Sequence, residues 1–261
     1  MSSRLNAAQK QSVKSFSSLT QTNEKIAIAC LSRVGYNIEA AIEHYYQNQQ
    51  HYVDPHQGGN DDSRVKKLFE RYANDAKDEL PDKIGPNGIE RLLNDLRLHP
   101  EDRKVLILAY KLNAEIQCEF SWPEWKKGLM DMRVDSVDSL RSRLDEIDDG
   151  LRESSQFKPL YQFTFTYGKN AGQRNLSLEV AIIYWKILFK DQFVLLPLWE
   201  EFMNTEYGKA VTKDTWNLLF DFAFNIKSDL SNYDEEGAWP VVLDNFVQWV
   251  RPRLNGDMMQ S

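Results

Sequence analysis

The chain has 261 residues, of which 42% are hydrophobic and 27% charged, and its formal net charge is −7. An acidic chain argues against nucleic-acid binding, because contacts to phosphate dominate that affinity and require a basic face. The negative charge of the chain is better matched by a basic patch on a protein partner than by nucleic acid.

Targeting and redox signals are sparse. No apolar stretch reaches the roughly 18 residues that span a bilayer, and Met1–Arg4 is followed by no hydrophobic signal region. The chain has two cysteines, Cys30 and Cys118, which are too few for a disulfide framework and fit a reducing compartment. We therefore expect a protein of the nucleus and cytoplasm without a membrane partner.

The segment up to Asn48 predicts three short helices. Thr22 is placed to cap the second helix, Gly35 to end it and Asn37 to start the third. Apolar residues recur at helical spacing in each helix: Val13, Phe16 and Leu19; then Ile26, Ala29, Cys30 and Val34; then Ile38, Ala41, Ile42 and Tyr45. These patterns predict a small three-helix bundle over residues 8–48.

Residues 47–63 read QNQQHYVDPHQGGNDDS, with a proline, a Gly-Gly pair and almost nothing to bury. This composition is typical of a linker. We place the linker at residues 49–63 and a second, larger domain at residues 64–255.

Helical patterns follow one another through the second domain. Ser121 and Glu124 form a capping box, Ser177 is expected to cap a later helix, and Pro100 and Pro197 suit first turns. The apolar stripes are Val65–Tyr72, Ile89–Leu96, Val105–Leu112, Val137–Leu151, Ile182–Phe189, Leu198–Phe202, Trp216–Ile226 and Trp239–Val250. Apart from a weak alternation over residues 163–167, we find no strand pattern, so the predicted fold class is all-α.

Residues that could carry out chemistry are scarce. The four histidines, at 44, 51, 56 and 99, do not form a metal-binding pattern. Cys118 lies among apolar neighbours and is interpreted as a small core residue or as part of a pocket wall. The acidic stretches 75–85 and 229–245 lack the ligand spacing of a calcium loop. We expect no cofactor, no metal and no catalytic residue.

The most unusual segment is Ser231–Phe246, which holds Asp234, Glu235, Glu236 and Asp244 without a lysine or arginine. The acids could simply favour the start of the last helix. Alternatively, Gly237-Ala238 beside them leaves a flat surface that suits a basic side chain of a partner. The residues alone leave both interpretations open.

Several separated blocks resemble the defective-in-cullin-neddylation family. They are NYDEEGAWPVVLDNFVQWVRP (232–252), YQFTF (161–165), KDTWN (213–217) and QCEF (117–120). Residues 22–25 (TNEK) and 29–31 (ACL) resemble the N-terminal ubiquitin-associated (UBA) domain of that family. The resemblance implies a UBA-like bundle, a linker and a potentiating-neddylation domain of degenerate EF-hand-like helix pairs.

The resemblance also implies a function. The family acts as non-catalytic, scaffold-type ligase components that bind a cullin C-terminal region and the neddylation conjugating enzyme, and so speed transfer of the ubiquitin-like modifier to the cullin. Such a rate gain comes from proximity and orientation. The family's Asp-Ala-Asp cullin contact matches Asp214, Ala238 and Asp244 here.

A second surface implied by the resemblance is an apolar pocket for the acetylated N-terminus of the conjugating enzyme. Acetylation removes a terminal charge that would be costly to bury. The matching positions are Ile89, Val105, Leu106, Leu108, Ala109, Leu112, Cys118, Phe120 and Tyr184.

Ubiquitin is a further partner that the UBA-like resemblance implies. In UBA domains a Met-Gly-aromatic motif joins the first two helices, whereas this chain has Leu19-Thr-Gln-Thr22 there. The alternative to a neddylation scaffold is a ubiquitin receptor or shuttle that acts mainly through residues 8–48.

Overall fold

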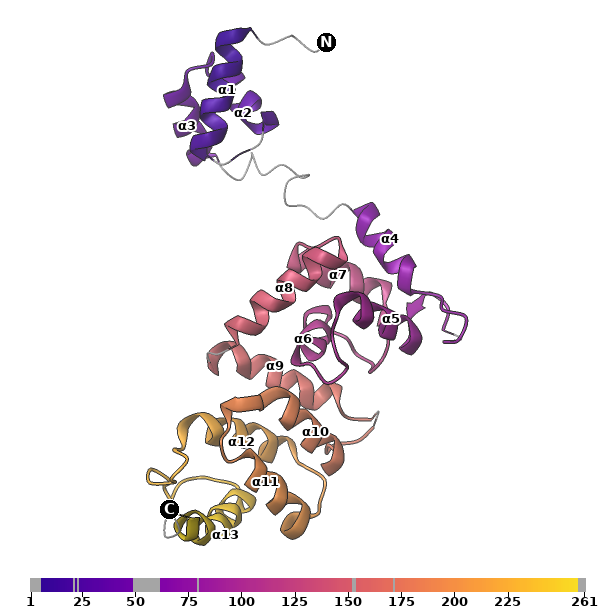
Figure 1. Cartoon of the computed structure of the whole chain (residues 1–261), viewed down its shortest axis with the longest axis vertical. Coiled ribbons are helices and arrows are strands. Elements are labelled where there is room, and N and C mark those ends of the chain that lie inside the picture. Colours follow the sequence, from indigo (N-terminus) through magenta and orange to yellow (C-terminus); the bar gives the residue numbers. More distant parts are fainter. Residues whose placement is uncertain are drawn as a thin grey trace. The chain divides into compact units, whose positions relative to one another are not determined.

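The computed structural model describes residues 6–257 except for 21, 23, 49–61, 79, 152, 153 and 171. The chain divides into two compact units, Met1–Asp61 and Asp62–Ser261 (Figure 1). Most of the predicted linker, 49–61, lies outside the described residues, and its last two residues belong to the first helix of the second unit. Within the described residues, no helix combines the length and apolar character needed to cross a membrane.

The first unit is the predicted three-helix bundle of α1 (Ala7–Thr20), α2 (Glu24–Arg33) and α3 (Ile38–Gln47). Gly35 has a positive φ after α2, and the side chain of Asn37 accepts a hydrogen bond from the Ala40 amide at 3.1 Å, which caps α3. The bundle has its own core, formed by Val13, Phe16, Ile26, Ala27, Cys30, Leu31 and Ala41.

Two predicted core positions of the bundle are wrong. Leu19 lies in the last turn of α1 and is 63% exposed. Ala29 is exposed, and Ala27 is buried in its place. The sequence could not select the inward face of α2 because residues 26–31 are all apolar.

The second unit is helical with two short strands and carries its own core. Its elements are α4 (Asp62–Tyr72), β1 (Lys83–Ile84), α5 (Pro86–Leu96), α6 (Arg103–Leu112), β2 (Phe120–Ser121), α7 (Trp122–Met132), α8 (Val137–Gly150), α9 (Ser154–Tyr167), α10 (Leu178–Phe189), η2 (Lys190–Gln192), α11 (Leu196–Phe202), η3 (Met203–Tyr207), α12 (Lys213–Asn225) and α13 (Val241–Asp257). The alternation over residues 163–167 is part of α9, and Trp239 precedes the last helix instead of starting it.

Helix pairs in this unit are joined through their loops, as in EF-hand pairs. β1 and β2 are antiparallel, with Ile84 opposite Phe120. The same arrangement recurs further along, where Leu176 and Val211 exchange backbone hydrogen bonds of 2.9 and 2.7 Å. These two ladders join α4–α5 to α6–α7, and α9–α10 to α11–α12.

Acidic groups in the first pair of loops are engaged by the protein itself. The Asp78 carboxylate accepts hydrogen bonds from the amides of Asn87 and Gly88 at 2.8 and 3.1 Å, which caps α5. Glu124 accepts from the Glu115 and Ser121 amides at 2.9 and 2.7 Å, which completes the predicted capping box. These carboxylates therefore stabilise helix starts.

A buried aromatic cluster fixes α9, α10 and α12 against one another. The Tyr161 hydroxyl donates to the Trp216 carbonyl oxygen and accepts from the Trp185 indole, both at 2.9 Å. The Trp216 indole donates to the Tyr161 carbonyl oxygen at 2.9 Å, and the two tryptophan rings stack with centroids 5.4 Å apart. Because Tyr184 adjoins Trp185 and Asp214 lies two residues before Trp216, this cluster positions both predicted surfaces.

Replacing Tyr161 with phenylalanine is expected to lower the free energy of unfolding by about 1–3 kcal/mol, because the buried indole of Trp185 loses its acceptor. Urea denaturation measures the change. Tyr110→Phe is the matched control, since no hydroxyl hydrogen bond of Tyr110 is found within the described residues. A Tyr161→Phe loss no larger than that of the control would contradict the role given to the hydroxyl.

Candidate functional site

Asp214 lies in the first turn of α12 and is exposed. Asp214 does not cap this helix. The cap is Thr212, whose hydroxyl accepts a hydrogen bond from the Thr215 amide at 3.1 Å. The Asp214 carboxylate is therefore not used by the cap, and it is in the turn where a negative charge is favoured.

Ala238 and Asp244 are brought together by two aromatic residues. The Tyr233 hydroxyl donates to Asp244 Oδ1 at 2.6 Å, and the Tyr233 ring stacks on Trp239, the neighbour of Ala238, with centroids 5.8 Å apart. Ala238 is exposed and Asp244 is half-buried in the first turn of α13. The methyl group of Ala238 thus leaves the backbone open beside a fixed carboxylate.

Tyr233 is a residue that the sequence did not single out. Burial, together with its hydrogen bond to Asp244, raises the pKa of the Tyr233 phenol. The phenol therefore stays neutral and remains a donor to the carboxylate at physiological pH. The hydrogen bond holds Oδ1 of the Asp244 carboxylate and so orients the second oxygen of that carboxylate. Because the phenol is neutral, the negative charge of Asp244 remains.

The link from these residues to Asp214 runs through α12. The ring of Phe222 contacts those of Tyr233 and Trp239 at centroid distances of 5.8 and 5.9 Å. Phe222 follows Asp214 by eight residues, or about 12 Å along a helix. Ala238 and Asp244 are thus held close together by residues that pack against α12. Asp214 lies on the same helix, about two turns before Phe222.

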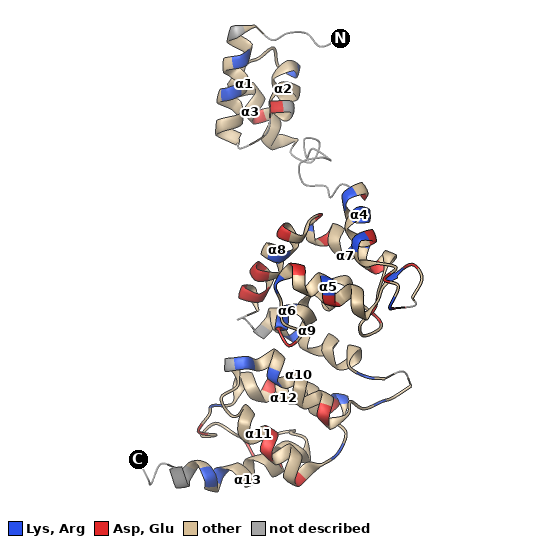
Figure 2. Ribbon diagram, turned by 45° about the vertical axis from the view of Figure 1, so that its right-hand side comes forward, with Lys and Arg blue, Asp and Glu red and all other residues tan. Residues whose placement is uncertain are grey.

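Asp214 and Asp244 differ in their pairing from most of the acids of α8. Acidic residues recur along α8 (Figure 2), but four of its five acids are neutralised locally: Asp138, Asp145, Glu146 and Asp148 pair with Arg141, Lys104, Arg143 and Arg103. Within the described part of the chain, neither Asp214 nor Asp244 forms an ion pair with a lysine or arginine. Their negative charge is therefore available to a basic partner.

The nine residues of the predicted pocket are distributed over α5, α6, the loop with β2, and α10. Leu106, Leu108, Ala109, Leu112, Phe120 and Tyr184 are buried, Ile89 and Val105 are half-buried, and Cys118 is exposed. Eight of them belong to the core of this unit or pack against it. Four of the nine pocket residues have accessible surface or a polar atom: Ile89, Val105, Cys118 and Tyr184.

Cys118 does not lie in a helix core as predicted from its apolar neighbours. It is in the loop between α6 and β2, it is exposed, and its φ is +60°. The turn that leads into β2 requires this left-handed conformation, which hydrophobic spacing cannot reveal. Of the two earlier interpretations, the core residue is wrong.

Tyr184 is tied to the same loop through Gln117. Its hydroxyl donates to Gln117 Oε1 at 3.2 Å, and Gln117 Nε2 donates to the Tyr167 carbonyl oxygen at 3.0 Å. Burial raises the pKa of Tyr184 to about 12. The wall formed by Tyr184 is therefore uncharged, and Gln117, which the site prediction did not include, holds it in place.

The described residues contain no group of three or more His, Cys, Asp or Glu side chains arranged to hold a metal ion. What the structure presents is a set of surfaces: unpaired acids on α12 and α13, and an apolar region with a neutral phenol at α10. These features, on a helical frame with a separate three-helix unit, define a protein-binding module.

Comparisons with known proteins agree with this class. The profile of a family described as cullin binding matches residues 139–249, and that of a UBA-like domain matches residues 10–51. The chain is 39% identical over 275 residues to Defective in cullin neddylation protein 1 of Caenorhabditis elegans, which covers 97% of this chain and 93% of that protein.

For two further relatives, the match covers a smaller share of the relative's own length. DCN1-like protein 3 of Xenopus laevis is 37% identical over 199 residues, covering 74% of this chain and 64% of that protein. DCN1-like protein 3 of Homo sapiens is 38% identical over 195 residues, covering 73% of this chain and 63% of that protein. The chain belongs to the defective-in-cullin-neddylation family.

Proposed function

We propose that this chain is a scaffold-type co-ligase that binds a cullin and promotes its neddylation. The observation that carries this conclusion is the cullin-binding match, which includes the acidic residues of α12 and α13. Asp214 and Asp244 have no basic partner within the described residues, and Ala238 leaves room for close approach. Basic side chains of a cullin would supply the missing charge.

We further propose that the chain makes no covalent intermediate with the modifier. A scaffold accelerates transfer when it holds the donor and the acceptor in a reactive geometry, which turns a bimolecular encounter into a step within one complex. The two surfaces of the second unit are suited to this role because one is acidic and the other apolar. They can bind two partners of different chemistry at once.

For the apolar surface we propose the acetylated N-terminus of the neddylation conjugating enzyme as the ligand. The exposed Cys118, the half-buried Ile89 and Val105, and the neutral Tyr184 offer it apolar contacts. An acetyl cap carries no charge, so its burial avoids the large cost of burying an ammonium group without a partner.

The test is a reconstituted time course of cullin modification with the conjugating enzyme limiting, with and without the full chain. Acceleration that is lost when Asp214 and Asp244 are both reversed to lysine supports the scaffold and its acidic surface. Asp149→Lys with Glu179→Lys is the matched control, because both are exposed acids outside that surface. If components shown to be active are not accelerated, the proposed function fails.

The second candidate is a ubiquitin receptor, which the UBA-like match at residues 10–51 favours. Leu19 and Tyr46 are exposed apolar side chains on this unit, 63% and 56% accessible, as a hydrophobic contact surface requires. Removing residues 1–61 separates the two candidates, since they form a compact unit of their own. A scaffold that works through the second unit keeps its acceleration after this deletion, whereas a ubiquitin receptor loses its binding.

A further inference from the structure

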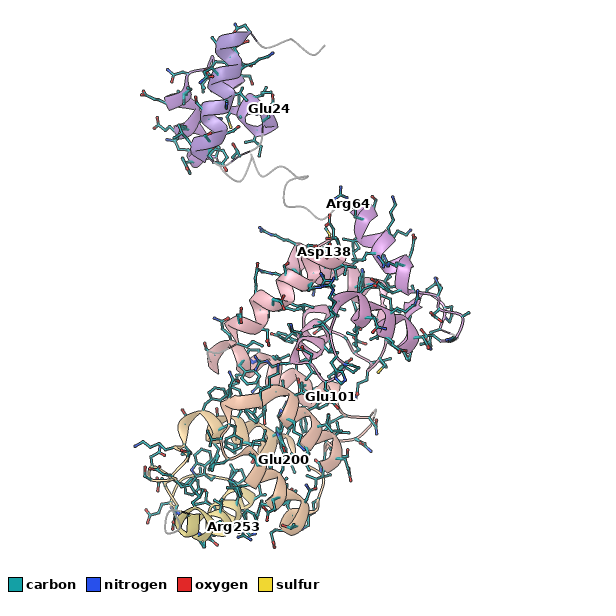
Figure 3. The ribbon with its side chains drawn as sticks, viewed as in Figure 1. Glu24, Arg64, Glu101, Asp138, Glu200 and Arg253 are labelled. Atoms are coloured by element: carbon teal, nitrogen blue, oxygen red, sulfur yellow. The ribbon has the colours of Figure 1, made fainter. Side chains whose placement is uncertain are left out.

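A hollow of about 470 Å³ lies between the end of α11, the turn η3 and α13, which are joined by ring contacts. Phe202 is buried and its ring centroid lies 5.7 Å from that of Trp249. The hollow is lined by Phe202, Glu206, Tyr207, Asn245, Gln248 and Trp249. Glu200 on α11 and Arg253 on α13 locate the two helices in Figure 3.

The hollow is continuous with the acidic surface. Gln248 follows Asp244 by four residues on α13, so the two side chains lie on the same face of the helix, about 5–6 Å apart at Cβ. Both Gln248 and Asn245 are exposed. A partner that contacts Asp244 therefore meets the polar rim of the hollow next.

The charge of the hollow is negative and unused. Glu206 is exposed, and within the described residues it accepts only a 3.4 Å hydrogen bond from the Thr205 hydroxyl and pairs with no lysine or arginine. Arg253 on α13 is not among the lining residues; it donates to the Trp249 carbonyl oxygen at 2.7 Å, and its guanidinium lies over the Trp249 ring at 3.5 Å. Its guanidinium is thus engaged within α13 itself.

The backbone that carries Glu206 has an unusual form. Residues 203–207 form a π-helical turn, closed by a hydrogen bond of 2.9 Å from the Gly208 amide to the Met203 carbonyl oxygen. π-turns within helices occur frequently at functional sites. Here the turn places Glu206 and Tyr207 on the side of α11 that faces α13, at the mouth of the hollow.

We propose that the cullin contact extends from Asp244 across Gln248 into this hollow, which takes a lysine or arginine side chain of the cullin. The aliphatic stem of such a side chain would lie on the aromatic floor, and its charged head would reach the Glu206 carboxylate. Asn245 and Gln248 would accept its remaining hydrogen bonds. This inference rests on the proposed cullin-binding function and adds a specificity-determining position to it.

The test measures the affinity of the full chain for a purified cullin C-terminal region by calorimetry at about 0.15 M salt, where exposed charges are screened beyond about 8 Å. Glu206→Lys is expected to weaken binding by about tenfold, and Glu206→Gln by a few-fold. The matched control is Glu201→Lys, an equal charge change at an exposed acid of α11 that does not line the hollow. It is expected to change the affinity less than about twofold.

Three results distinguish the possibilities. If Glu206→Lys weakens binding well beyond Glu201→Lys, the extended contact is supported. If the parent chain binds and Asp244→Lys abolishes binding, but the Glu206 and Glu201 variants behave alike, the hollow is not part of the contact and the proposed function still stands. If the parent chain does not bind the cullin region, both ideas fail. Gln248→Arg, at an exposed rim position, gives the same test should Glu206→Lys not fold.

Discussion

Reversing the charge of Asp244 to lysine is expected to weaken cullin binding by about 2–5 kcal/mol, or at least about 30-fold. The half-buried carboxylate has a fixed direction, because the Tyr233 hydroxyl holds Oδ1 at 2.6 Å. A lysine at this place meets basic cullin side chains with a like charge and leaves them unpaired in the contact. Calorimetric titration of the cullin C-terminal region into the full chain measures the change.

Two variants separate charge from shape at this position. Asp244→Asn keeps an acceptor for the Tyr233 hydroxyl and removes only the charge, so an intermediate loss of affinity is expected. Asp149→Lys makes the same charge change at an exposed acid on α8 and should leave the affinity nearly unchanged. An Asp244→Lys chain that folds, melts like the parent and binds the cullin equally well would rule out this residue as a contact.

The same substitution has a smaller effect on stability. Removing the acceptor of the partly buried Tyr233 hydroxyl costs about 1 kcal/mol of unfolding free energy, which a whole domain of this size tolerates. The loss of binding is therefore expected in a folded protein. A thermal melt of each variant beside the titration checks this directly.

The helical fold was predictable because its signals are local. The Asn37 and Ser177 caps and the Ser121–Glu124 capping box are found where they were predicted. Most of the apolar stripes lie within single helices and face the core, with Leu19, Ala29 and Trp239 among the exceptions. The pairing of loops was not predictable in the same way. The ladders Ile84–Phe120 and Leu176–Val211 join residues more than 30 positions apart and use backbone groups that every residue has.

The candidate site likewise combines residues that could be predicted before the structure with residues whose roles only the fold reveals. Asp214, Ala238 and Asp244 came from resemblance to a family, and the residues alone left the acidic segment open between a helix start and a docking surface. Tyr233 and Gln117 were missed because their roles depend on hydrogen bonds to Asp244 and Tyr184, which only the folded chain brings into reach. Cys118 was misplaced because a left-handed turn, not hydrophobic spacing, decides its exposure.

An acetylated peptide with the N-terminal sequence of the neddylation conjugating enzyme is expected to bind about 30- to 150-fold more tightly than the same peptide with a free amine, at about pH 7. Two costs add. The free α-amine has a pKa of about 7.7–8.0, so giving up its proton before burial costs about 1 kcal/mol at that pH. The missing acetyl group forfeits about 1–2 kcal/mol of apolar contact.

The pH dependence distinguishes these two costs. The proton cost falls as the pH rises above the α-amine pKa, so the free peptide should gain about five- to tenfold in affinity by about pH 9. The acetylated peptide should gain nothing, because it has no such group and because burial raises the pKa of Tyr184 to about 12, so the phenol stays neutral over this range. Equal affinity of the two peptides at every pH would show that the N-terminus does not enter the apolar surface. If the ratio of the two peptides' affinities stays constant with pH, the tighter binding of the acetylated peptide comes entirely from contacts of the acetyl group.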